Sequence, residues 1–383
     1  MTADEGPGGD PDIEALTDAD ALAEDEDVVD SELRKVLAGA FQKTPELPFS
    51  EFLDIVLYDP RWGYYTRRRE ILGSKGDFQT APHVHPLFGW TIARAVQREW
   101  EKRGRPKEFT VVEVGPGAAY LMDDLWSYLK QIRQDTTGWQ VALIERSENL
   151  RKVQEQRLAG KVSATWHRDI GELGAFSGVV VANEFLDALP FRRVARRGMG
   201  WKELCVTARD PEARELAWKE RDISEHALTE VLPRSAPQGT IIEESPFAVD
   251  WVRTLSSHLQ KGLALFFDYG DLQEDLVENH PEGTLQTFGR HRAGRDPFEK
   301  LGSRDITAWV DFSPILAAAE SAGFGIGGIQ SQAETLYEWG MTQVAEELAR
   351  AEGEGSLEAV KARMAAKTFL FGYPTHRVLQ LTK

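Results

Sequence analysis

The stretch FTVVEVGPGAAYLM, residues 109–122, joins a strand pattern to a helix through a short glycine turn. Strand-forming residues at 110–114 lead into Gly115-Pro116-Gly117, and LMDDLWSYLKQI, which has helical spacing, follows at once. Because glycine has no Cβ, the backbone at Gly115 and Gly117 can turn sharply and approach a ligand closely. The pattern therefore favours a nucleotide-like group on this turn, although turn formation alone explains the same letters.

A second expected strand ends in an acidic residue. Glu145 directly follows the apolar run over 141–144, about thirty residues after Glu113. The carboxyl ends of neighbouring parallel strands line one crevice, where a carboxylate can accept hydrogen bonds from both hydroxyls of a ribose. Glu145 is therefore the ribose candidate. The alternative is a solvated acid that caps the helix beginning near Ser147.

Two motifs that the sequence lacks indicate which nucleotide binds. The dinucleotide fingerprint has a third glycine where this chain has Tyr120, and neither GxxxxGKS nor GxxxxGKT occurs. A cofactor with a ribose and no phosphate, S-adenosylmethionine, fits better. Its amino acid portion would lie on the Gly115 to Gly117 turn and its ribose on Glu145.

Strand and helix patterns alternate between residues 109 and 185, which predicts a doubly wound, Rossmann-like parallel sheet in an α/β fold. After the glycine strand, further strands are expected at 141–144, 163–166, 178–182, 262–267 and 326–331 and in the closing THRVLQLT. Helices are expected at 31–41, 49–58, 87–102, 121–134, 148–158, 246–259 and 313–322 and over most of 336–367. Ser50 and Thr44 are the candidate caps of the second helix.

Charge separates the first residues from the rest of the chain. The 383 residues carry a net charge of −17, and residues 1–30 contain twelve acids and no Lys or Arg. This composition predicts a disordered acidic tail at 1–30. A helical and loop segment at 31–108 would cover the pocket, and an α/β domain would occupy 109–383, with insertions at about 191–243 and 271–312.

Composition also restricts location and partners. The tail is neither Arg-rich, like a mitochondrial presequence, nor apolar, like a secretory signal, and no apolar run reaches eighteen residues. A single cysteine, Cys205, permits no internal disulfide, and no basic face favours nucleic acid. We therefore expect a soluble, cytoplasmic protein that neither inserts into a membrane nor binds nucleic acid. The oligomeric state stays open, with a dimer as one option.

Three other features have two interpretations each. The stretch 58–89 mixes aromatic residues with glycines, which is typical of a pocket wall or lid and also of an Ω-like loop that packs onto the core. A basic cluster after residue 191 is interpreted as a solvated face and not as a ligand site; it contains Arg192, Arg193, Arg196 and Arg197. His83, His85 and His291 have no carboxylate cluster at ligand spacing, so no metal site is expected.

Polar side chains follow two further strands. Asn183, Glu184 and Asp187 come after the apolar run at 178–182, and Asp268 follows the run at 262–267. In parallel sheets these positions lie at the crevice where substrates react. Helix capping would explain Asn183 alone. We therefore expect this polar group to lie beside the substrate.

Several motifs in combination resemble the MidA-like methyltransferases, the family that includes the mitochondrial arginine methyltransferase of respiratory complex I assembly. The resemblance covers about residues 45–383. The motifs occur in the family's order and read PFSEFLDIVLYDPRWGYY, GSKGDFQTAP, VVEVGPG, LIERS, VVANEFLDALP, FFDYG, LQTFGRHR and ITAWVDF. The resemblance implies a class I S-adenosylmethionine-dependent methyltransferase with an N-terminal helical segment and insertions that close over the pocket.

The resemblance also implies roles for single residues. The candidates for cofactor binding are Gly76, Asp77, Phe78, Glu113, Gly115, Pro116, Gly117, Glu145, Asp169 and Asn183. The candidates for catalysis are Glu184, Asp187 and Asp268, the last followed by Tyr269 in the DYG motif. Two positions differ from the family's pattern: Ala118-Ala119 stands where GPGRG is usual, and His83 stands in place of a Glu. The Cβ atoms of the alanines are harmless only if the backbone φ stays below zero.

The leading hypothesis is a methyltransferase that acts on a protein arginine, with a respiratory-complex subunit as one conceivable substrate. The carboxylates of Glu184, Asp187 and Asp268 would hold the guanidinium group in a forked geometry. One alternative is a small-molecule O- or N-methyltransferase, in which His83 would deprotonate a hydroxyl. Another is an assembly factor that binds the cofactor weakly or not at all, suggested by Ala118, Ala119 and the acidic tail.

Overall fold

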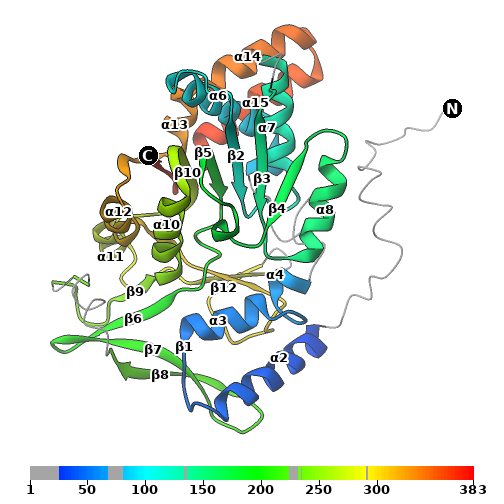
Figure 1. The fold of residues 1–383 in the computed structure, drawn as a ribbon. Coiled ribbons are helices and arrows are strands. Elements are labelled where there is room, and N and C mark those ends of the chain that lie inside the picture. The colour runs from blue at the N-terminus through cyan, green and yellow to red at the C-terminus, as the bar shows by residue number, and fades with distance from the viewer. Residues whose placement is uncertain (1–25, 68–80, 133–135, 224–231, 234, 290–291) are drawn as a thin grey trace.

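The computed structural model describes residues 26–67, 81–132, 136–223, 232–233, 235–289 and 292–383. A central sheet has the strand order β15-β16-β10-β5-β2-β3-β4, with β14 paired to β10 (Figure 1). Its strands are β2 (Phe109–Val114), β3 (Trp139–Ile144), β4 (Ala164–His167), β5 (Phe176–Asn183), β10 (Leu259–Asp271), β14 (Val310–Asp311), β15 (Gly325–Ser331) and β16 (His376–Thr382). Neighbours are parallel except that β16 is antiparallel to β10 and β15. The predicted α/β fold with a mostly parallel sheet is confirmed.

Helices cover both faces of this sheet. Val111 and Val179 pack in one core, and Val112 and Val180 pack in the core on the opposite face. The first core contains α6 (Leu87–Lys102), α7 (Tyr120–Ile132), α13 (Gln332–Glu338), α14 (Met341–Glu352) and α15 (Leu357–Phe371), and the second contains α10 (Pro246–His258) and α12 (Phe312–Ser321). Because both faces are covered, all six residues of β2 are buried.

The N-terminal helices pack together with the insertions in a second region, below the central sheet in Figure 1. Leu33 and Phe52 of the helices share one core with Val206 and Ile306 of the insertions. The elements are α2 (Glu26–Phe41), β1 (Leu47–Pro48), α3 (Phe49–Tyr58), α4 (Tyr64–Arg67), β6 (Arg192–Arg197), β7 (Gly200–Ala208), β8 (Leu216–Asp222), β9 (Ile241–Glu244), β11 (Gln286–Gly289), β12 (Arg292–Gly294) and β13 (Asp305–Thr307). Segments far apart in the sequence thus form one body beside the sheet.

Two expectations about charged segments are wrong in part. Helix α2 begins at Glu26, so residues 26–30 belong to a helix and not to a disordered tail; Val29 is fully buried against the second region. The basic cluster is only partly solvated, because Arg193 and Arg196 are each only 9% exposed while the Arg197 side chain is 39% exposed. The Arg193 Nε lies 2.9 Å from an oxygen of Glu243, which β9 brings alongside β6.

The remaining differences concern the limits of elements. The insertion expected at about 271–312 contains the small sheet β12-β11-β13, and the last helical stretch is three helices. Neither Ser50 nor Thr44 caps α3, since the residue at its N-cap is Pro48 and the Thr44 hydroxyl donates to the Glu46 carbonyl. None of the helices in the described ranges combines the length and apolar character that crossing a membrane requires.

Candidate active site

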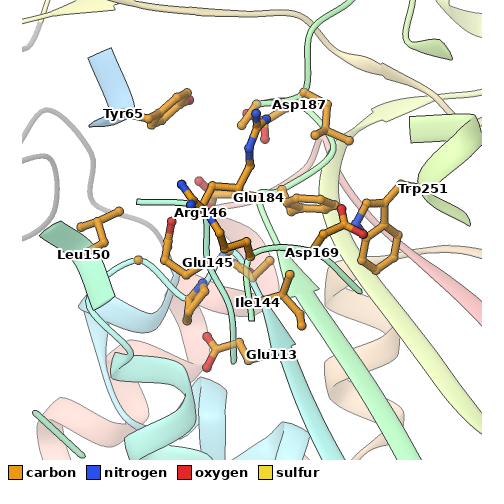
Figure 2. A pocket seen from close by; sticks show the side chains of 18 of the residues that line it. Tyr65, Glu113, Ile144, Glu145, Arg146, Leu150, Asp169, Glu184, Asp187 and Trp251 are labelled. Carbon is orange, nitrogen blue, oxygen red and sulfur yellow. The ribbon is translucent and has the colours of Figure 1, made fainter. Parts of the chain in front are cut away.

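A cavity of about 750 Å³ lies at the carboxyl ends of β2, β3, β4 and β5. This volume is within the range of small-molecule and cofactor sites. Its lining includes Glu113, Gly115, Pro116, Gly117, Ala118, Tyr120, Ile144, Glu145, Arg146, Leu150, Asp169, Asn183, Glu184, Phe185, Asp187, Trp251 and, from the second region, Tyr58, Tyr65 and Asp305. Figure 2 shows Tyr65 and Asp187 at the opposite end from Glu113, with Glu145 between them.

The glycine turn forms one wall of the cavity. Gly115 and Gly117 have φ values of +62° and +53°, the left-handed region that glycine enters without strain. A Cβ on Gly115 would lie 3.4 Å from the Phe185 ring. Ala119 also has a positive φ, +60°. The expectation that its Cβ would be harmless required a φ below zero, so the backbone here is strained by about 1 kcal/mol. The side chain of Ala119 is buried in the first core, however, and not in the cavity.

Glu145 faces the cavity and is held from two sides. Its Oε1 accepts a hydrogen bond from the backbone N–H of Ser147 at 2.8 Å, and its Oε2 accepts one from Gln154 Nε2 at 3.1 Å. Ser147 is itself the N-cap of α8 (Glu148–Leu158), because its hydroxyl accepts from the backbone N–H of Leu150. Glu145 is only 9% exposed, so it is not the solvated acid of the alternative interpretation.

Gln154 is a residue that the sequence reasoning missed. Its Nε2 also donates to the Gly117 carbonyl at 2.8 Å, and its Oε1 accepts from Trp166 Nε1 at 3.0 Å. One fully buried amide therefore ties the glycine turn to the ribose candidate Glu145. The signal lies in the helical spacing, since Leu150, Gln154 and Leu158 occupy the buried positions of α8 and only Gln154 is polar.

The other cofactor candidates lie in different surroundings. Glu113, 3% exposed, lines the cavity with an Oε2 atom that has no hydrogen-bond partner among the described residues, and burial raises its pKa well above the usual value. Asp169 lines the cavity at the end of β4, where its Oδ1 accepts from the Gly171 N–H at 2.8 Å. Asn183 also lines the cavity. Gly76, Asp77 and Phe78 lie outside the described residues, as does the side chain of His83.

The turn after β5 provides two carboxyl groups to the far end of the cavity. Glu184 has a positive φ, +48°, and its backbone N–H donates to the Phe267 carbonyl at 2.8 Å. Burial, followed by the charge of Asp187, raises the Glu184 pKa to about 8. Burial raises the pKa of Asp187 to about 6. Positive φ in a side chain larger than Asn or Asp is uncommon and concentrates at functional sites.

Asp187 is oriented by one neighbour and retains one unused oxygen. The Tyr269 hydroxyl donates to its Oδ2, whereas Oδ1 has no hydrogen-bond partner within the described part of the chain. Asp187 is only 8% exposed, so this oxygen is largely removed from water. A buried carboxylate oxygen without a donor is costly, and a cationic ligand would satisfy it.

Asp268 does not lie where the sequence placed it. It does not line the cavity; its Oδ2 accepts from the backbone N–H groups of Leu186 and Asp187 at 2.8 and 3.3 Å, and its Oδ1 from that of Tyr269 at 3.0 Å. The apolar run ends at residue 267, but β10 continues to Asp271, so Asp268 is inside the strand. It fixes the turn that carries Asp187, and the expected contact with substrate is wrong.

Two tyrosines from the N-terminal helices close the far end. The Tyr58 hydroxyl donates to the Ala188 carbonyl at 2.7 Å, and the Tyr65 hydroxyl donates to Asp305 Oδ1 at 2.8 Å. Their ring centroids are 5.3 Å apart. The aromatic stretch therefore supplies part of the pocket wall. Within the described residues, no group of three or more His, Cys, Asp or Glu side chains has a metal-binding arrangement.

This geometry fits S-adenosylmethionine. The cofactor carries a cationic sulfonium and a cationic amino group, and the unpartnered buried oxygen of Glu113 can accept a hydrogen bond from the amino group. The open glycine turn leaves room for the amino acid portion, and Glu145 can still accept hydrogen bonds from a ribose because a carboxylate has about four acceptor sites. Ile144 and Leu150 are among the apolar residues that line the same cavity.

Comparison with known proteins agrees with this fit. A family model for S-adenosyl-L-methionine-dependent methyltransferases matches residues 91–330. The protein arginine methyltransferase NDUFAF7 homolog, mitochondrial, of Drosophila melanogaster is 30% identical over 319 residues, which are 76% of this chain and 70% of that protein. The human protein arginine methyltransferase NDUFAF7, mitochondrial, is 27% identical over 76% of this chain and 69% of its own length.

A solved structure resembles the whole fold. The crystal structure of a Burkholderia thailandensis protein bound to S-adenosyl-homocysteine has a TM-score of 0.85 and 30% sequence identity. The match covers 94% of this chain and 94% of that one. Close similarity over nearly the full length, including the insertions, extends the likeness beyond the sheet that many unrelated enzymes share.

Proposed function

The chain belongs to the S-adenosyl-L-methionine-dependent methyltransferase family, and from this we propose that it methylates an arginine side chain of a protein. The observation that carries the choice of acceptor is the acidic far end of the cavity, where Asp187 keeps a buried oxygen without a partner among the described residues. A guanidinium group is planar, cationic and able to donate several hydrogen bonds to carboxylates. The names of the curated relatives, which include arginine methylation, support the same acceptor.

The cofactor supplies an electrophilic methyl group on a positively charged sulfur. We assign its binding to the glycine turn, Glu113, Glu145, Asp169 and Asn183, with Gly76, Asp77 and Phe78 carried over from the sequence resemblance. The protein's task is then to hold the acceptor nitrogen in line with the methyl group at near-attack distance. Gln154 and Asp268 serve this task as positioning residues, since they hold Glu145 and the Asp187 turn.

One proton must leave the acceptor nitrogen when its new bond to carbon forms. Glu184 is the candidate to receive it, because its carboxyl lines the cavity and burial together with the charge of Asp187 raises its pKa to about 8. A general base works best when its pKa is near the working pH. Asp187, whose pKa is about 6, would remain charged at pH 7 and hold the guanidinium group.

The two other hypotheses from the sequence rank lower. The hydroxyl-methylating alternative depends on the side chain of His83, which lies outside the described structure. The assembly-factor alternative depends on a turn damaged by Ala118 and Ala119, yet Ala119 packs into the core and Ala118 borders an open cavity. A cytoplasmic location remains a proposal, because the names of the relatives place those proteins in mitochondria. A respiratory-complex subunit as the substrate also remains a proposal, because those names give no substrate.

The test is to incubate the full chain with S-adenosylmethionine labelled in its methyl group and a soluble protein extract, then to hydrolyse the products and separate the amino acids. We expect labelled methylarginine, and none from a Glu145→Ala variant. Label confined to a methylated hydroxyl or carboxyl, with arginines unmodified, would contradict the proposal.

A further inference from the structure

The second region contributes a carboxylate to the cavity that the sequence analysis did not single out. Asp305 lies at the start of β13, in the insertion after residue 271, and is only 2% exposed. It lines the cavity together with Tyr58 and Tyr65, which come from the N-terminal helices. Three segments distant in the sequence therefore meet at the end of the cavity that Asp187 occupies.

The contacts show that this end is held in a fixed shape. The Tyr65 hydroxyl and the backbone N–H of Ile306 both donate to Asp305 Oδ1, each at 2.8 Å. Tyr58 is fastened to the carbonyl of Ala188, next to Asp187. Tyr64 packs edge-on against Tyr65, with ring centroids 5.1 Å apart. The two carboxylates and two rings are therefore set before any ligand arrives, which lowers the entropic cost of binding.

The carboxylates at this end of the cavity affect the hydroxyl groups of both Tyr58 and Tyr65. Burial, and then the charge of Asp305, raise the pKa of both Tyr58 and Tyr65, and Asp187 adds to the effect in both. The contacts place the carboxylates beside this pair of rings, since Tyr65 donates to Asp305 and Tyr58 donates to the carbonyl of Ala188, the neighbour of Asp187. A desolvated pair of anions beside aromatic faces is a site for a cation that can also stack, because ring faces attract cations and carboxylates accept its hydrogen bonds.

A guanidinium group already lies against one of these rings. The Cζ atom of Arg146 is 5.0 Å from the centroid of the Tyr58 ring, and Arg146 lines the cavity (Figure 2). Its charge lowers the Tyr58 pKa, opposing the two carboxylates. Arg146 is exposed and follows Glu145 directly, so its long side chain can leave this position without disturbing the sheet.

We propose that Tyr58, Tyr65, Asp187 and Asp305 form the subsite for the acceptor's guanidinium group, and that Arg146 stacks there until the acceptor displaces it. We call these four residues the acceptor subsite. This inference rests on the proposed arginine methylation and adds two things to it: a carboxylate supplied by the insertion and an internal competitor for the acceptor. Arginine fits the subsite better than lysine because only its guanidinium is flat enough to stack and to donate to two carboxylates at once.

The test measures binding, so that it does not depend on knowing the substrate. Calorimetry would measure the affinities of two probes, acetyl-arginine methylamide and its lysine counterpart. Both are titrated into the full chain saturated with S-adenosylhomocysteine. Asp305→Asn is compared with Asp222→Asn, and Arg146→Ala with Arg363→Ala. Asp222, on β8, has a side chain that is 88% exposed, and Arg363, on α15, is also exposed; neither residue lines the cavity. Melting curves and S-adenosylhomocysteine affinity check that each variant is folded.

We expect the arginine probe to bind at least tenfold more tightly than the lysine probe, and to lose about tenfold or more in affinity in Asp305→Asn. The arginine probe should bind at least about threefold more tightly to Arg146→Ala, because the competing Arg146 side chain is absent. Both control variants should stay within twofold of the unmodified protein. If Asp305→Asn does not fold, the opposite-sign effect of Arg146→Ala still decides the proposal.

Four results would overturn the proposal, and they separate the subsite from the proposed function. Equal arginine affinity in Asp305→Asn, or weaker affinity in Arg146→Ala, removes the acceptor subsite while arginine methylation stands. Equal affinity for the two probes would contradict both the subsite's preference for arginine over lysine and the choice of arginine as the methyl acceptor. Binding of neither probe at millimolar concentration removes the subsite, and the methyl-labelling assay still decides the function.

Discussion

The two ends of the cavity are built in different ways. The end with the glycine turn, Glu113 and Glu145 comes from β2, β3 and the turns that follow them, within about forty residues of sequence. The opposite end combines Tyr58, Tyr65, Asp187 and Asp305, which come from three segments spread across the chain. The first end is built within the parallel sheet, and the second depends on the N-terminal helices and insertions of this chain. The difference suggests that the first end binds the cofactor and the second selects the acceptor.

The largest expected effect is at the acceptor end. Glu184→Gln removes the proton acceptor but keeps the side chain's shape, so kcat should fall roughly a thousandfold, the middle of the range for a general base. Affinity for S-adenosylhomocysteine should stay within threefold. Steady-state kinetics and calorimetry measure the two quantities, and the exposed Glu278→Gln in α11 (Gln273–Asn279) is the control. Equal losses in both quantities would show that the two ends are not separate.

At the cofactor end, Glu145→Ala should weaken S-adenosylhomocysteine binding on the order of a hundredfold, because two hydrogen bonds to a charged carboxylate are lost. Calorimetry measures this directly. Glu148→Ala, three residues further along at an exposed position, should bind normally. Unchanged binding in Glu145→Ala would mean that the carboxylate holds only the start of α8, through Ser147.

Gln154→Leu tests the link within the cofactor end. The substitution leaves the Gly117 carbonyl and Glu145 without the amide that joins them. We expect about tenfold weaker S-adenosylhomocysteine binding, and a loss of 1–3 kcal/mol in unfolding free energy for the unsatisfied buried groups, as an order-of-magnitude estimate. Denaturant unfolding separates the two effects. A loss of stability with full affinity would limit Gln154 to a structural role.

The pH dependence of activity should report the acceptor end. The carboxyls of Asp187 and Glu184 have pKa values of about 6 and 8, and both must be ionised to hold a cation or to accept a proton. We expect kcat/KM to rise about a hundredfold between pH 6 and pH 8 and to level off above pH 8. The rise should be smaller in Glu184→Gln. A profile that falls over this range would contradict both roles.

The same shifts make an opposite prediction for stability. Both pKa values are raised above those of an unfolded chain, so the protonated forms favour the folded state. The stability that these groups add is complete at pH values below their unfolded pKa and is lost as the pH rises through 6 to 8. The melting temperature of the unmodified protein should therefore fall over that range relative to Glu184→Gln.

The smallest expected effect concerns the turn that differs from the family pattern. Ala119→Gly relieves the strain of a positive φ but removes a buried methyl group and adds chain entropy, so the terms largely cancel. Unfolding free energy should change by less than about 1 kcal/mol, and S-adenosylhomocysteine affinity by less than twofold. A large gain in affinity would show that Ala119 impairs the cofactor end.

The sequence predicted most of the glycine-turn end of the cavity because its signals are local. The β2 run, the glycine turn and the acid after β3 each follow from short-range spacing, and α3, α6 and α8 have the predicted limits. The structure places Glu113, Glu145, Asp169 and Asn183 around one cavity. Gln154 was missed because its three partners lie on other elements, at Gly117, Glu145 and Trp166.

Distant pairing explains the errors at the acceptor end and in the insertions. Asp268 was assigned to substrate because the apolar run stops before it, whereas strand pairing with β16 carries β10 past it. Arg193 was assigned to solvent because Glu243, its buried partner, is fifty residues away in the sequence. Asp305 was not singled out because nothing near it in the sequence shows that Tyr65, 240 residues earlier, donates to it.

The most direct measurement is titration of S-adenosylhomocysteine into the unmodified protein, Glu145→Ala and Asp187→Asn. We predict binding to the unmodified protein, a loss on the order of a hundredfold in Glu145→Ala, and affinity within threefold of the unmodified protein in Asp187→Asn. That result would place the cofactor at the glycine turn and leave the acidic end for the acceptor. Equal losses in both variants, or no binding by the unmodified protein, would contradict a cavity with a cofactor end and an acceptor end.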